Sequence, residues 1–402
     1  MKVLVLNCGS SSIKYQVLDM GDTPQLLCKG LAERIGASDS VLKHESVRDG
    51  RKVEIQESFP THTEGVERIL QCIVAGDGGV LESLDELVAV GHRVVHGGEF
   101  FRDATLITPE SKAKIEACND LAPLHNPANL MGVSAMEALL PKVPQVAVFD
   151  TAFHQTLPER AYLYALPNEY YTKYRIRKYG FHGTSHRYVA ERAAKVLGRP
   201  LEELKLITCH LGNGASMAAV RGGESVETSM GFTPVDGLMM GTRSGELDPS
   251  TLLFIAEREG LDLQGMNDLI NKQSGLLGVS GRSNDMRDCS EAAIHGDRWP
   301  RAAVELFTYR ICKFIGQYIA VLQGLDGLVF TGGIGENSSM VREMVVENFG
   351  YLGIRLDRVA NDGNHSVEGA ISAADSSIPV LVVPTNEELV IAQDTVRVAS
   401  SL

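Results

Sequence analysis

The residues of this 402-residue chain that could carry chemistry start with a glycine–serine turn. Gly9 is followed by Ser10, Ser11 and Ser12, between two apolar runs that predict strands, and Lys14 lies just beyond. Backbone N–H groups and hydroxyls in such a turn, with a cation close by, suit a cluster of phosphate oxygens. Taken alone, the stretch favours the alternative, which is an ordinary β-hairpin with a polar turn.

Further glycine-rich turns occur along the chain, at 212–214, 241–245 and 332–337. None has the spacing of a Walker A phosphate loop or of a Rossmann dinucleotide fingerprint. The segment from Gly332 to Asn337 follows an apolar strand and precedes a capped helix. This position suits a close approach of the backbone to a nucleotide, and an ordinary connecting loop is the alternative.

Two arginines lie in sequence surroundings where a positive charge needs an anionic partner. Arg93 lies in an apolar strand-like run, and Arg243 lies in a glycine turn. An unpaired guanidinium in an apolar strand is costly, so Arg93 needs either a fixed carboxylate or an anionic substrate, and Arg243 raises the same question. His182 and His186 are four residues apart but lack the glutamate of a zinc protease motif, so we do not predict a metal there. Without a chemical role, His182 would only end a turn.

Composition narrows the class of protein. Apolar residues make up 44% and charged residues 22% of the chain, as in a globular protein, and the length predicts two domains. The net charge of −13 argues against nucleic acid as a partner. The seven cysteines are scattered and form no Cys-x-x-Cys pair, which predicts reduced thiols. No signal peptide or membrane span is recognisable, so the sequence predicts a cytoplasmic protein.

The opening pattern of strand, glycine turn and strand returns near residue 205, with Gly212 in the place of Gly9. A second, weaker pair is 146–150 with 327–331, each an apolar strand that ends in polar or glycine residues. Together they predict two similar α/β domains, each opening with a hairpin. We place the boundary near residue 150 and expect the last helix to return to the first domain.

Helical spacing and capping residues predict the principal helices. Asp248 and Pro249 open one helix that Gly260 closes, Ser185 or Thr184 opens another, and the strongly apolar stretch 300–323 predicts a central packing helix. The segment Thr385–Glu388 has the spacing of a capping box. The expected helical ranges are 62–74, 109–119, 128–140, 186–197, 249–259, 300–323, a helix that Asn337 or Ser338 opens and Gly350 ends, and 389–398.

Several long strings of residues resemble the acetate kinase family. They run in order along nearly the whole chain, from residue 3 to residue 394, and none is broken: Asn7–Lys14, Tyr179–His186, His210–Gly214, Gly231–Gly245, Gly332–Asn337 and Pro384–Glu388. The family is part of the superfamily of sugar kinases, heat-shock ATPases and actin. The resemblance implies an α/β fold of duplicated actin-like ATPase (ribonuclease H-like) domains around a central nucleotide cleft, with residues 1–150 plus 386–402 in the first domain and 151–385 in the second.

The resemblance also implies a reaction, the reversible transfer of the γ-phosphoryl group of ATP to acetate with Mg²⁺, or alternatively Mn²⁺. The roles it implies are catalytic for Asp150, Arg93, His182 and Arg243, and metal binding for Asn7 and Glu387. A small apolar pocket for the methyl group would be formed by Val95, Leu124, Phe181 and Pro234, with Arg93 beside the carboxylate. The nucleotide would be bound by Ser10, Ser12, Lys14, His210, Leu211, Gly212, Asn213, Gly214, Asp285, Met286, Arg287, Gly332, Gly333, Ile334, Gly335 and Glu336.

The residues fit these implied roles chemically. Acetate is an anion at neutral pH, so Asp150 need not remove a proton and is expected to orient groups instead. Mg²⁺ prefers oxygen ligands, which Asn7 and Glu387 supply, although Glu387 could also serve only the helix dipole. For Glu388 we prefer a role in the capping box.

Alternative functions remain open at this stage. Propionate kinase differs in its substrate by one methylene, which is worth about 1–3 kcal/mol in an apolar pocket, and the sequence does not decide between them. A non-transferring actin-like ATPase would leave Arg93 and Arg243 unexplained. The resemblance implies a homodimer, with no nucleic acid or membrane partner.

Overall fold

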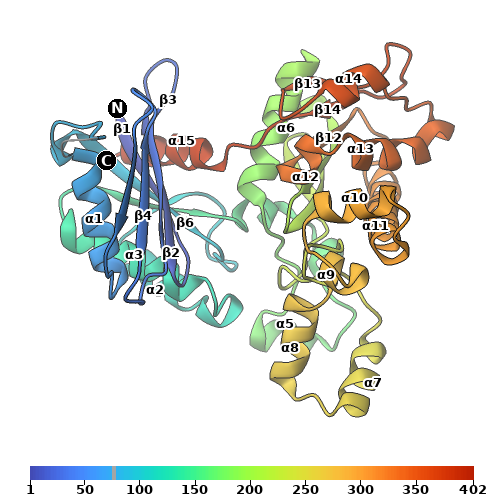
Figure 1. Ribbon diagram of the computed structural model, residues 1–402, viewed down its shortest axis with the longest axis horizontal. Helices are drawn as coiled ribbons and strands as arrows, with labels where there is room; N and C mark the ends of the chain where they lie inside the picture. The colour runs from blue at the N-terminus through green and yellow to red at the C-terminus, as the bar shows by residue number, and fades with distance from the viewer. Residues whose placement is uncertain (75–77) are drawn as a thin grey trace. The chain divides into compact units, whose positions relative to one another are not determined.

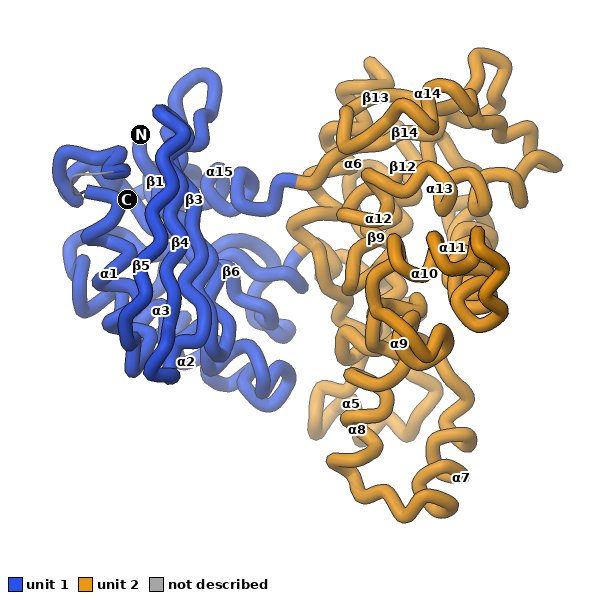
Figure 2. The backbone as a smooth tube through the Cα atoms, in the orientation of Figure 1, with its two compact units in different colours: residues 1–152, 386–402 blue, residues 153–385 orange. Residues whose placement is uncertain are grey.

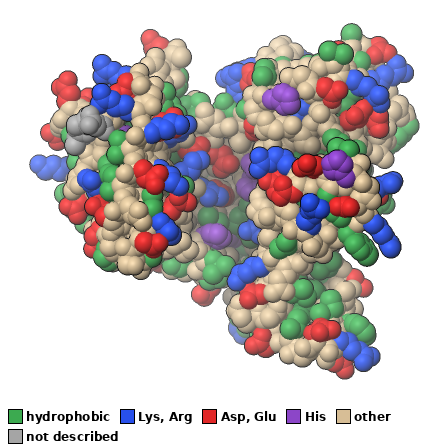
Figure 3. Space-filling model, in the orientation of Figure 1, with side chains coloured by type: hydrophobic (Ala, Val, Ile, Leu, Met, Phe, Trp, Pro, Cys, Tyr) green, Lys and Arg blue, Asp and Glu red, His purple; other side chains and the backbone are tan. Residues whose placement is uncertain are grey.

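The computed structural model describes residues 1–74 and 78–402. The chain divides into two compact units (Figures 1 and 2). Unit 1 contains residues 1–152 and 386–402, and unit 2 contains residues 153–385. On the face drawn in Figure 3, acidic and basic side chains are interspersed over each unit.

Unit 1 is built on an eight-stranded mixed sheet in the order β5-β4-β3-β2-β1-β6-β8-β7. The strands β1 to β5 pair antiparallel in chain order, β6 and β8 extend the sheet in parallel with β1, and β7 pairs antiparallel with β8. The strands are β1 (Lys2–Cys8), β2 (Ser12–Asp19), β3 (Gln25–Glu33), β4 (Val41–Ser46), β5 (Lys52–Gln56), β6 (Leu87–Val94), β7 (Thr105–Leu106) and β8 (Gln145–Phe149).

Helices cover both faces of this sheet. Successive side chains of β1 point to opposite faces, so they pack in two different cores. Leu4 and Leu6 pack against α1 (His62–Val74) and α3 (Asn126–Leu139) in one core. Val3 and Val5 pack in a second core with Ile391 of α15 (Glu387–Ala399), which contacts β1, β6 and β8. The remaining helical segments of unit 1 are η1 (Leu84–Glu86), α2 (Pro109–Glu116) and η2 (Asn119–Leu121). The segment η3 (Ala152–Thr156) begins in unit 1 at Ala152 and continues into unit 2.

Unit 2 has a six-stranded sheet in the order β11-β10-β9-β12-β14-β13. Its strands are β9 (Lys205–Leu211), β10 (Ala215–Arg221), β11 (Glu224–Thr228), β12 (Gly327–Thr331), β13 (Gly369–Ala370) and β14 (Val380–Val382). Its helical segments are α4 (Glu159–Tyr162), α5 (Asn168–Tyr174), α6 (Gly183–Leu197), η4 (Leu201–Glu203), α7 (Pro249–Glu259), α8 (Leu263–Lys272), α9 (Gly275–Ser280), α10 (Met286–Ile294), α11 (Arg298–Leu322), α12 (Gly332–Asn337), α13 (Ser339–Val346), η5 (Glu347–Leu352) and α14 (Arg358–Gly363).

The two sheets repeat one topology. The strands β3, β2, β1, β6 and β8 correspond in order and direction to β11, β10, β9, β12 and β14. The pairing of the Gly9 turn with the Gly212 turn is therefore confirmed. The second predicted pair is wrong, because 327–331 is β12, which takes the place of β6, whereas 146–149 lies in β8. Both are buried apolar strands, and composition alone does not reveal a strand's place in a sheet.

Two helices, α6 and α15, each pack on a different sheet from the one whose strand precedes them in the sequence. α6 follows β8 in the sequence but packs on β9, β10 and β12 of unit 2. α15 follows β14 in the sequence but packs on β1, β6 and β8 of unit 1. The prediction that the last helix returns to the first part of the chain is confirmed by these contacts.

Several predicted helix ends need correction. Asp248 and Gly260 bound α7 as predicted, and α11 carries its buried stripe as predicted. α6 begins at Gly183, so neither Thr184 nor Ser185 is its cap. The helix opened by Ser338 ends at Val346, not at residue 350, and the 3₁₀ segment η5 follows it to Leu352.

All seven cysteines are free thiols, as predicted. In the described part of the chain, the search for a helix with the length and apolar composition to cross a bilayer finds none.

Candidate active site

Arg93 and Asp150 form an ion pair at the carboxyl ends of two neighbouring strands of unit 1. Arg93 lies in β6, Asp150 directly follows β8, and these strands run parallel. Arg93 Nε is 3.0 Å from Asp150 Oδ1, and Nη2 is 2.6 Å from Oδ2, so the contact is bidentate. The Asp150 side chain is 2% exposed and that of Arg93 is 25% exposed. Of the two partners that the sequence left open for Arg93, a fixed carboxylate is present.

The third nitrogen of this guanidinium reaches the neighbouring strand β1. Arg93 Nη1 donates to Asn7 Oδ1 at 3.3 Å. Burial acts to lower the pKa of Arg93, but the charge and hydrogen bonds of Asp150, with Glu387 and Glu388 nearby, outweigh it and raise that pKa. Arg93 therefore stays a cation. Four predicted site residues lie together in unit 1: Asn7, Arg93, Asp150 and Glu387.

Glu387 is the first residue of α15 and experiences an excess of negative charge. Its pKa is raised to about 7, because burial disfavours its charge and Asp150 and Glu388 add to it, while Arg93 and Lys14 act in the opposite sense. A bound cation would relieve this repulsion. In residues 1–74 and 78–402, no three His, Cys, Asp or Glu side chains are grouped as a metal site. Mg²⁺ keeps waters and phosphate oxygens as ligands, so the Glu387 carboxylate and the Asn7 amide oxygen fit it.

Lys14 and Glu388 form an ion pair with each other. The predicted capping box is wrong: the cap of α15 is Asn386, whose Oδ1 accepts from the backbone N–H three residues later at 3.0 Å. The hydroxyl of Thr385 instead contacts Ser185 Oγ at 2.8 Å, within unit 2. Lys14 has a protein carboxylate as its partner in this structure, and a role toward phosphate stays a prediction.

Side chains from the helices α1 and α3 hold the glycine–serine turn at the end of β1. Gly9 N–H donates to Ser12 O at 2.8 Å, which closes the turn, and Ser10 is exposed. His62 Nε2 donates to Gly9 O at 2.8 Å, and Asn129 Nδ2 donates to the preceding Cys8 carbonyl at 2.7 Å. The turn has the geometry predicted for it, and its binding of phosphate stays a prediction.

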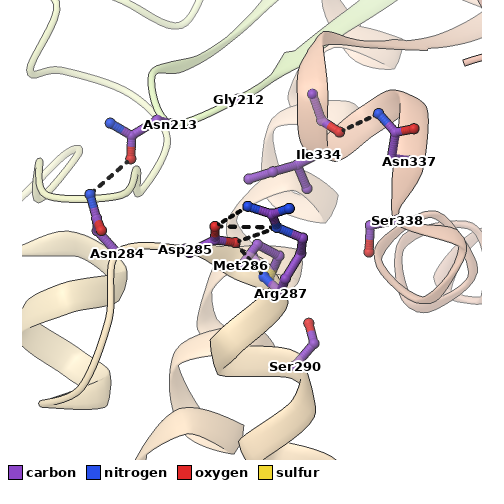
Figure 4. A pocket seen from close by; sticks show the side chains of 11 residues that line it. Gly212, Asn213, Asn284, Asp285, Met286, Arg287, Ser290, Ile334, Asn337 and Ser338 are labelled. Atoms are coloured by element: carbon purple, nitrogen blue, oxygen red, sulfur yellow. Dashed lines mark hydrogen bonds and ion pairs between the residues drawn. The ribbon is translucent and has the colours of Figure 1, made fainter.

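A pocket of about 620 Å³ lies within unit 2, in the size range of cofactor and ligand sites (Figure 4). It is formed by the turn after β9, the start of α10 and the helix α12 with the start of α13. The lining residues are Gly212, Asn213, Asn284, Asp285, Met286, Arg287, Ser290, Gly333, Ile334, Asn337 and Ser338. Seven of the predicted nucleotide-binding residues line it, whereas sequence reasoning missed Asn284, Ser290, Asn337 and Ser338 as lining residues.

The pocket wall combines apolar faces with a polar rim. Asp285 caps α10 and is held by Arg287, whose Nη2 is 2.6 Å from Asp285 Oδ2. Met286 and Ile334 supply apolar surface from opposite walls, and Figure 4 shows Ile334 on the α12 side facing the Asp285–Arg287 pair. Such a site can bind a flat heterocycle between apolar groups and a hydroxylated group at its rim.

The predicted loop at Gly332 is itself the short helix α12, and it lies close to β9. Gly332 has φ +76°, and a Cβ there would be 2.8 Å from the Leu211 carbonyl oxygen, so only glycine fits. The Glu336 carboxylate accepts from Gly332 N–H at 2.9 Å and from Thr385 N–H at 3.1 Å. Ser366 Oγ donates to its other oxygen at 2.9 Å. Glu336 thus shapes the loop and is not among the pocket's lining residues.

A fully buried arginine fixes the other end of α12. Arg342 Nη1 donates to the carbonyl oxygens of Gly335 and Glu336 at 2.9 and 2.8 Å. Nε and Nη2 donate to Asn361 at 2.8 Å each, and Nη2 also reaches Asn364 O at 3.1 Å. Burial lowers the pKa of Arg342 to about 10. No local sequence pattern marks this residue, because its partners at Asn361 and Asn364 are distant along the chain.

Two predicted catalytic residues meet at the second glycine turn. A Cβ built on Gly214 would lie 3.6 Å from His182 Nε2 and 3.7 Å from Arg243 Nη1. Across the described residues, no carboxylate is within ion-pair distance of Arg243, and its hydrogen-bond contact is Met240 Sδ at 3.9 Å. Burial lowers the pKa of Arg243. A partly buried guanidinium with no carboxylate partner among the described residues, beside His182 and the glycine turn, suits an anion.

His182 occupies the cap position of α6 in the left-handed backbone region, with φ 55° and ψ 24°. Such a conformation is uncommon outside glycine, although histidine adopts it more often than most residues. Its ring stacks on His210, with centroids 4.2 Å apart. Its Nδ1 is 2.9 Å from Ser216 Oγ, and its Nε2 lies on the side of Gly214.

The predicted methyl pocket draws on both units. Val95 in unit 1 and Phe181 in unit 2 are buried, Pro234 is half-buried, and Leu124 is 71% exposed. Val95 N–H donates to Asn129 Oδ1 at 3.0 Å, so its backbone is tied to α3. The pocket itself stays a prediction.

Comparison with known proteins gives one family. The profile of the acetokinase family matches residues 2–393. The chain is 56% identical to the acetate kinase of Thermotoga maritima over the full length of both chains. It also matches the crystal structure of Porphyromonas gingivalis acetate kinase with 50% identity and a TM-score of 0.95, covering 99% of each chain.

A propionate kinase is also a near structural relative. The crystal structure of a propionate kinase from Francisella tularensis is 43% identical, with a TM-score of 0.91, and the match covers 98% of this chain and 99% of that one. The repeated sheets and these relatives identify the actin-like ATPase fold, as predicted. The chain belongs to the acetokinase family.

Proposed function

We propose that this protein is an acetate kinase that transfers the γ-phosphoryl group of ATP to acetate, forming acetyl phosphate and ADP. The observation that carries this proposal is Arg243. It is a partly buried cation with a lowered pKa, and it lies beside His182 and the Gly214 turn. A transferring phosphoryl group, whose charge is spread over three oxygens, is the kind of ligand that such a group of donors stabilises.

The reaction needs no proton transfer on the acetate side. A carboxylate oxygen of acetate forms a bond to the γ-phosphorus while the bond from that phosphorus to the β–γ bridging oxygen breaks, and the electron pair leaves on ADP. Because acetate arrives ionised, Asp150 has no proton to remove. Its ion pair instead fixes the Arg93 guanidinium, which turns Nη1 toward Asn7 and can orient the acetate carboxylate.

We propose the remaining roles from the family resemblance, and the geometry within each unit supports them. The pocket of unit 2 takes the adenosine, and the turn from His210 to Gly214 takes the β- and γ-phosphates. Mg²⁺, or Mn²⁺, would be held by Asn7 and Glu387 and would neutralise charge on these phosphates. The family resemblance adds a homodimer in the cytoplasm to the proposal.

Propionate is the second candidate acceptor, because the propionate kinase of known structure is 43% identical over nearly the whole chain. We favour acetate, because relatives that are more than 50% identical over the full length are named acetate kinases.

The test measures the product directly. The protein is incubated with MgATP and either acetate, propionate or no carboxylate. ADP release is followed by a coupled assay, and the acyl phosphate is trapped with hydroxylamine as a hydroxamate. We expect equal amounts of ADP and hydroxamate and a higher kcat/KM for acetate. Equal ADP release without any carboxylate would instead support an actin-like ATPase, and a higher kcat/KM for propionate would reassign the substrate.

A further inference from the structure

The Nδ1 side of the His182 ring is held by a buried hydroxyl. Ser216 is in β10 and fully buried, and its Oγ lies 2.9 Å from His182 Nδ1. The same oxygen lies 2.8 Å from His186 Nε2, one helical turn further along α6. A single serine hydroxyl therefore connects two imidazoles.

The second imidazole stays neutral. His186 is fully buried, and burial together with His154 and His210 lowers its pKa well below the usual value. Its Nδ1 lies 2.7 Å from Thr208 Oγ1. A neutral imidazole carries one N–H, so one ring nitrogen of His186 donates and the other accepts.

Because each hydroxyl has one hydrogen, the chain Thr208–His186–Ser216–His182 can run in two directions. In the first, Thr208 donates to His186 Nδ1, His186 Nε2 donates to Ser216, and Ser216 donates to His182 Nδ1. Neutral His182 then carries its hydrogen on Nε2. In the second, every hydrogen bond is reversed and His182 Nδ1 donates, so Nε2 has a hydrogen only if the ring is doubly protonated.

The direction matters because of what Nε2 faces. It points to the Gly214 turn, where Arg243 also approaches. A lone pair at Nε2 would repel phosphate oxygens, whereas an N–H would bind them. The stack on His210, with 24° between the ring planes, limits ring rotation. His210 has a similar arrangement, since its Nδ1 lies 2.8 Å from Ser185 Oγ, and that oxygen lies 2.8 Å from Thr385 Oγ1.

We propose that Ser216 is a positioning residue for phosphoryl transfer, which together with His186 holds His182 as a hydrogen-bond donor at Nε2. This rests on the proposed function, in which His182 contacts the transferring phosphoryl group. Ser216 itself touches neither substrate. It acts by fixing which nitrogen of His182 carries the hydrogen and in which plane the ring lies.

The kinetic test uses Ser216→Ala. Without the hydroxyl, His182 loses the group that fixes its tautomer, and we expect kcat to fall by about 10²-fold. The KM values for ATP and acetate should change by less than about threefold, because the adenosine pocket and Arg93 are untouched. Ser216→Cys keeps a weak donor and should recover part of kcat, and it also serves if the alanine variant does not fold.

Ser225→Ala is the matched control. Ser225 Oγ makes an equally buried contact of 2.8 Å to His154 Nδ1. His154 Nε2 donates to the Phe181 carbonyl at 3.0 Å, and since a carbonyl can only accept, this bond fixes the His154 tautomer without the serine. We expect kcat of Ser225→Ala to stay within about twofold of the unsubstituted enzyme.

A second measurement does not depend on catalysis. The ¹⁵N NMR spectrum of protein labelled in histidine reports which ring nitrogen carries hydrogen, and His182→Gln identifies the His182 signals. We expect a protonated Nε2 and a bare Nδ1 in the unsubstituted protein and in Ser225→Ala, and a mixture of tautomers in Ser216→Ala.

The two measurements separate the possible failures. An unchanged His182 tautomer in Ser216→Ala, or a kcat within about threefold of the original, would overturn the positioning role. If the protein did not phosphorylate acetate at all, the proposed function would fail, while the tautomer result would still decide what Ser216 does to His182.

Discussion

The two units treat their key arginine differently. In unit 1, Arg93 is held by a bidentate carboxylate, and the fold itself supplies the counter-charge. In unit 2, Arg243 lies beside His182 with no carboxylate within ion-pair distance in the part of the chain that the structure describes. The sequence pattern was the same for both, a cation in a setting that needs an anion.

The two arginines therefore differ in their expected contribution to the stability of the folded protein. Arg93 and Asp150 neutralise each other, so the loss of either partner would leave a buried charge alone. Within the described residues no opposite charge offsets the burial of Arg243, so we expect this arginine to destabilise the free protein. A residue that destabilises the free protein but can bind an anion is better explained by function than by stability. The comparison therefore predicts opposite effects on stability and similar effects on catalysis.

Arg93→Ala should have the largest combined effect. It removes a group that orients acetate and leaves the Asp150 carboxylate, which is 2% exposed, without its partner. We expect turnover to be lost and the free energy of unfolding to fall by about 3 kcal/mol. Coupled kinetics at saturating acetate and urea unfolding measure the two effects.

A double variant isolates the ion pair as the cause. Replacing both partners, in Arg93→Met with Asp150→Leu, removes both charges together and should restore most of the stability but none of the activity. If Arg93→Ala alone were as stable as the unsubstituted protein, the ion pair would not be the structural element that we infer.

Arg243→Ala should lower kcat by about 10²- to 10³-fold with no loss of stability, because in the described part of the chain this arginine has no ion pair to break. The control is Arg258→Ala, which removes an exposed arginine of α7 and should change neither property. Unfolding midpoints and steady-state kinetics on the same preparations provide the comparison. A marked drop in the midpoint for Arg243→Ala would show that its role is structural.

The smallest expected effect is a pH dependence of stability shared by both units. Burial lowers the pKa of His92 in unit 1 and of His154 in unit 2 to about 4 each. An unfolded histidine titrates near 6.5, so between these values the unfolded chain binds more protons, and stability falls as the pH is lowered. Between about pH 7.5 and about pH 5, each should cost about 2 kcal/mol.

Unfolding in urea at the two pH values tests this dependence. His154→Gln should remove one histidine's share of the loss, while the exposed His295→Gln should not. Equal pH dependence in all three proteins would mean that His154 is not buried in its neutral form.

Local patterns were enough to predict the parts of the fold that depend on neighbouring residues. The hairpin around Gly9, the helix 62–74 and the cap at Asp248 all follow from turn, spacing and capping rules that act over a few residues. The position of β12 could not be predicted, because pairing in a sheet depends on distant strands. The capping box at Thr385 failed for a related reason, since Ser185 takes up its hydroxyl.

The candidate site shows the same division. Gly212 and Gly333 line the pocket, and the sequence could point to them because they belong to glycine-rich motifs. Ser290, Arg342 and Ser216 carry no such mark, since an isolated serine or arginine in a helix or strand looks the same whether it is exposed or buried. Only the fold brings Ser290 to the pocket, Arg342 to the end of α12 and Ser216 to His182.

The packing of α15 on unit 1 has a consequence for how the chain is made. One face of that sheet, with Val3, Val5 and Val148, is covered by Ile391 and its neighbours on α15. The ribosome synthesises all of unit 2 between β8 and α15, and at about 5–20 residues per second this delay is on the order of 10–50 s. During this interval the nascent sheet has an apolar face without its helix. Unit 1 therefore begins synthesis first but can complete its core only after unit 2 has been made.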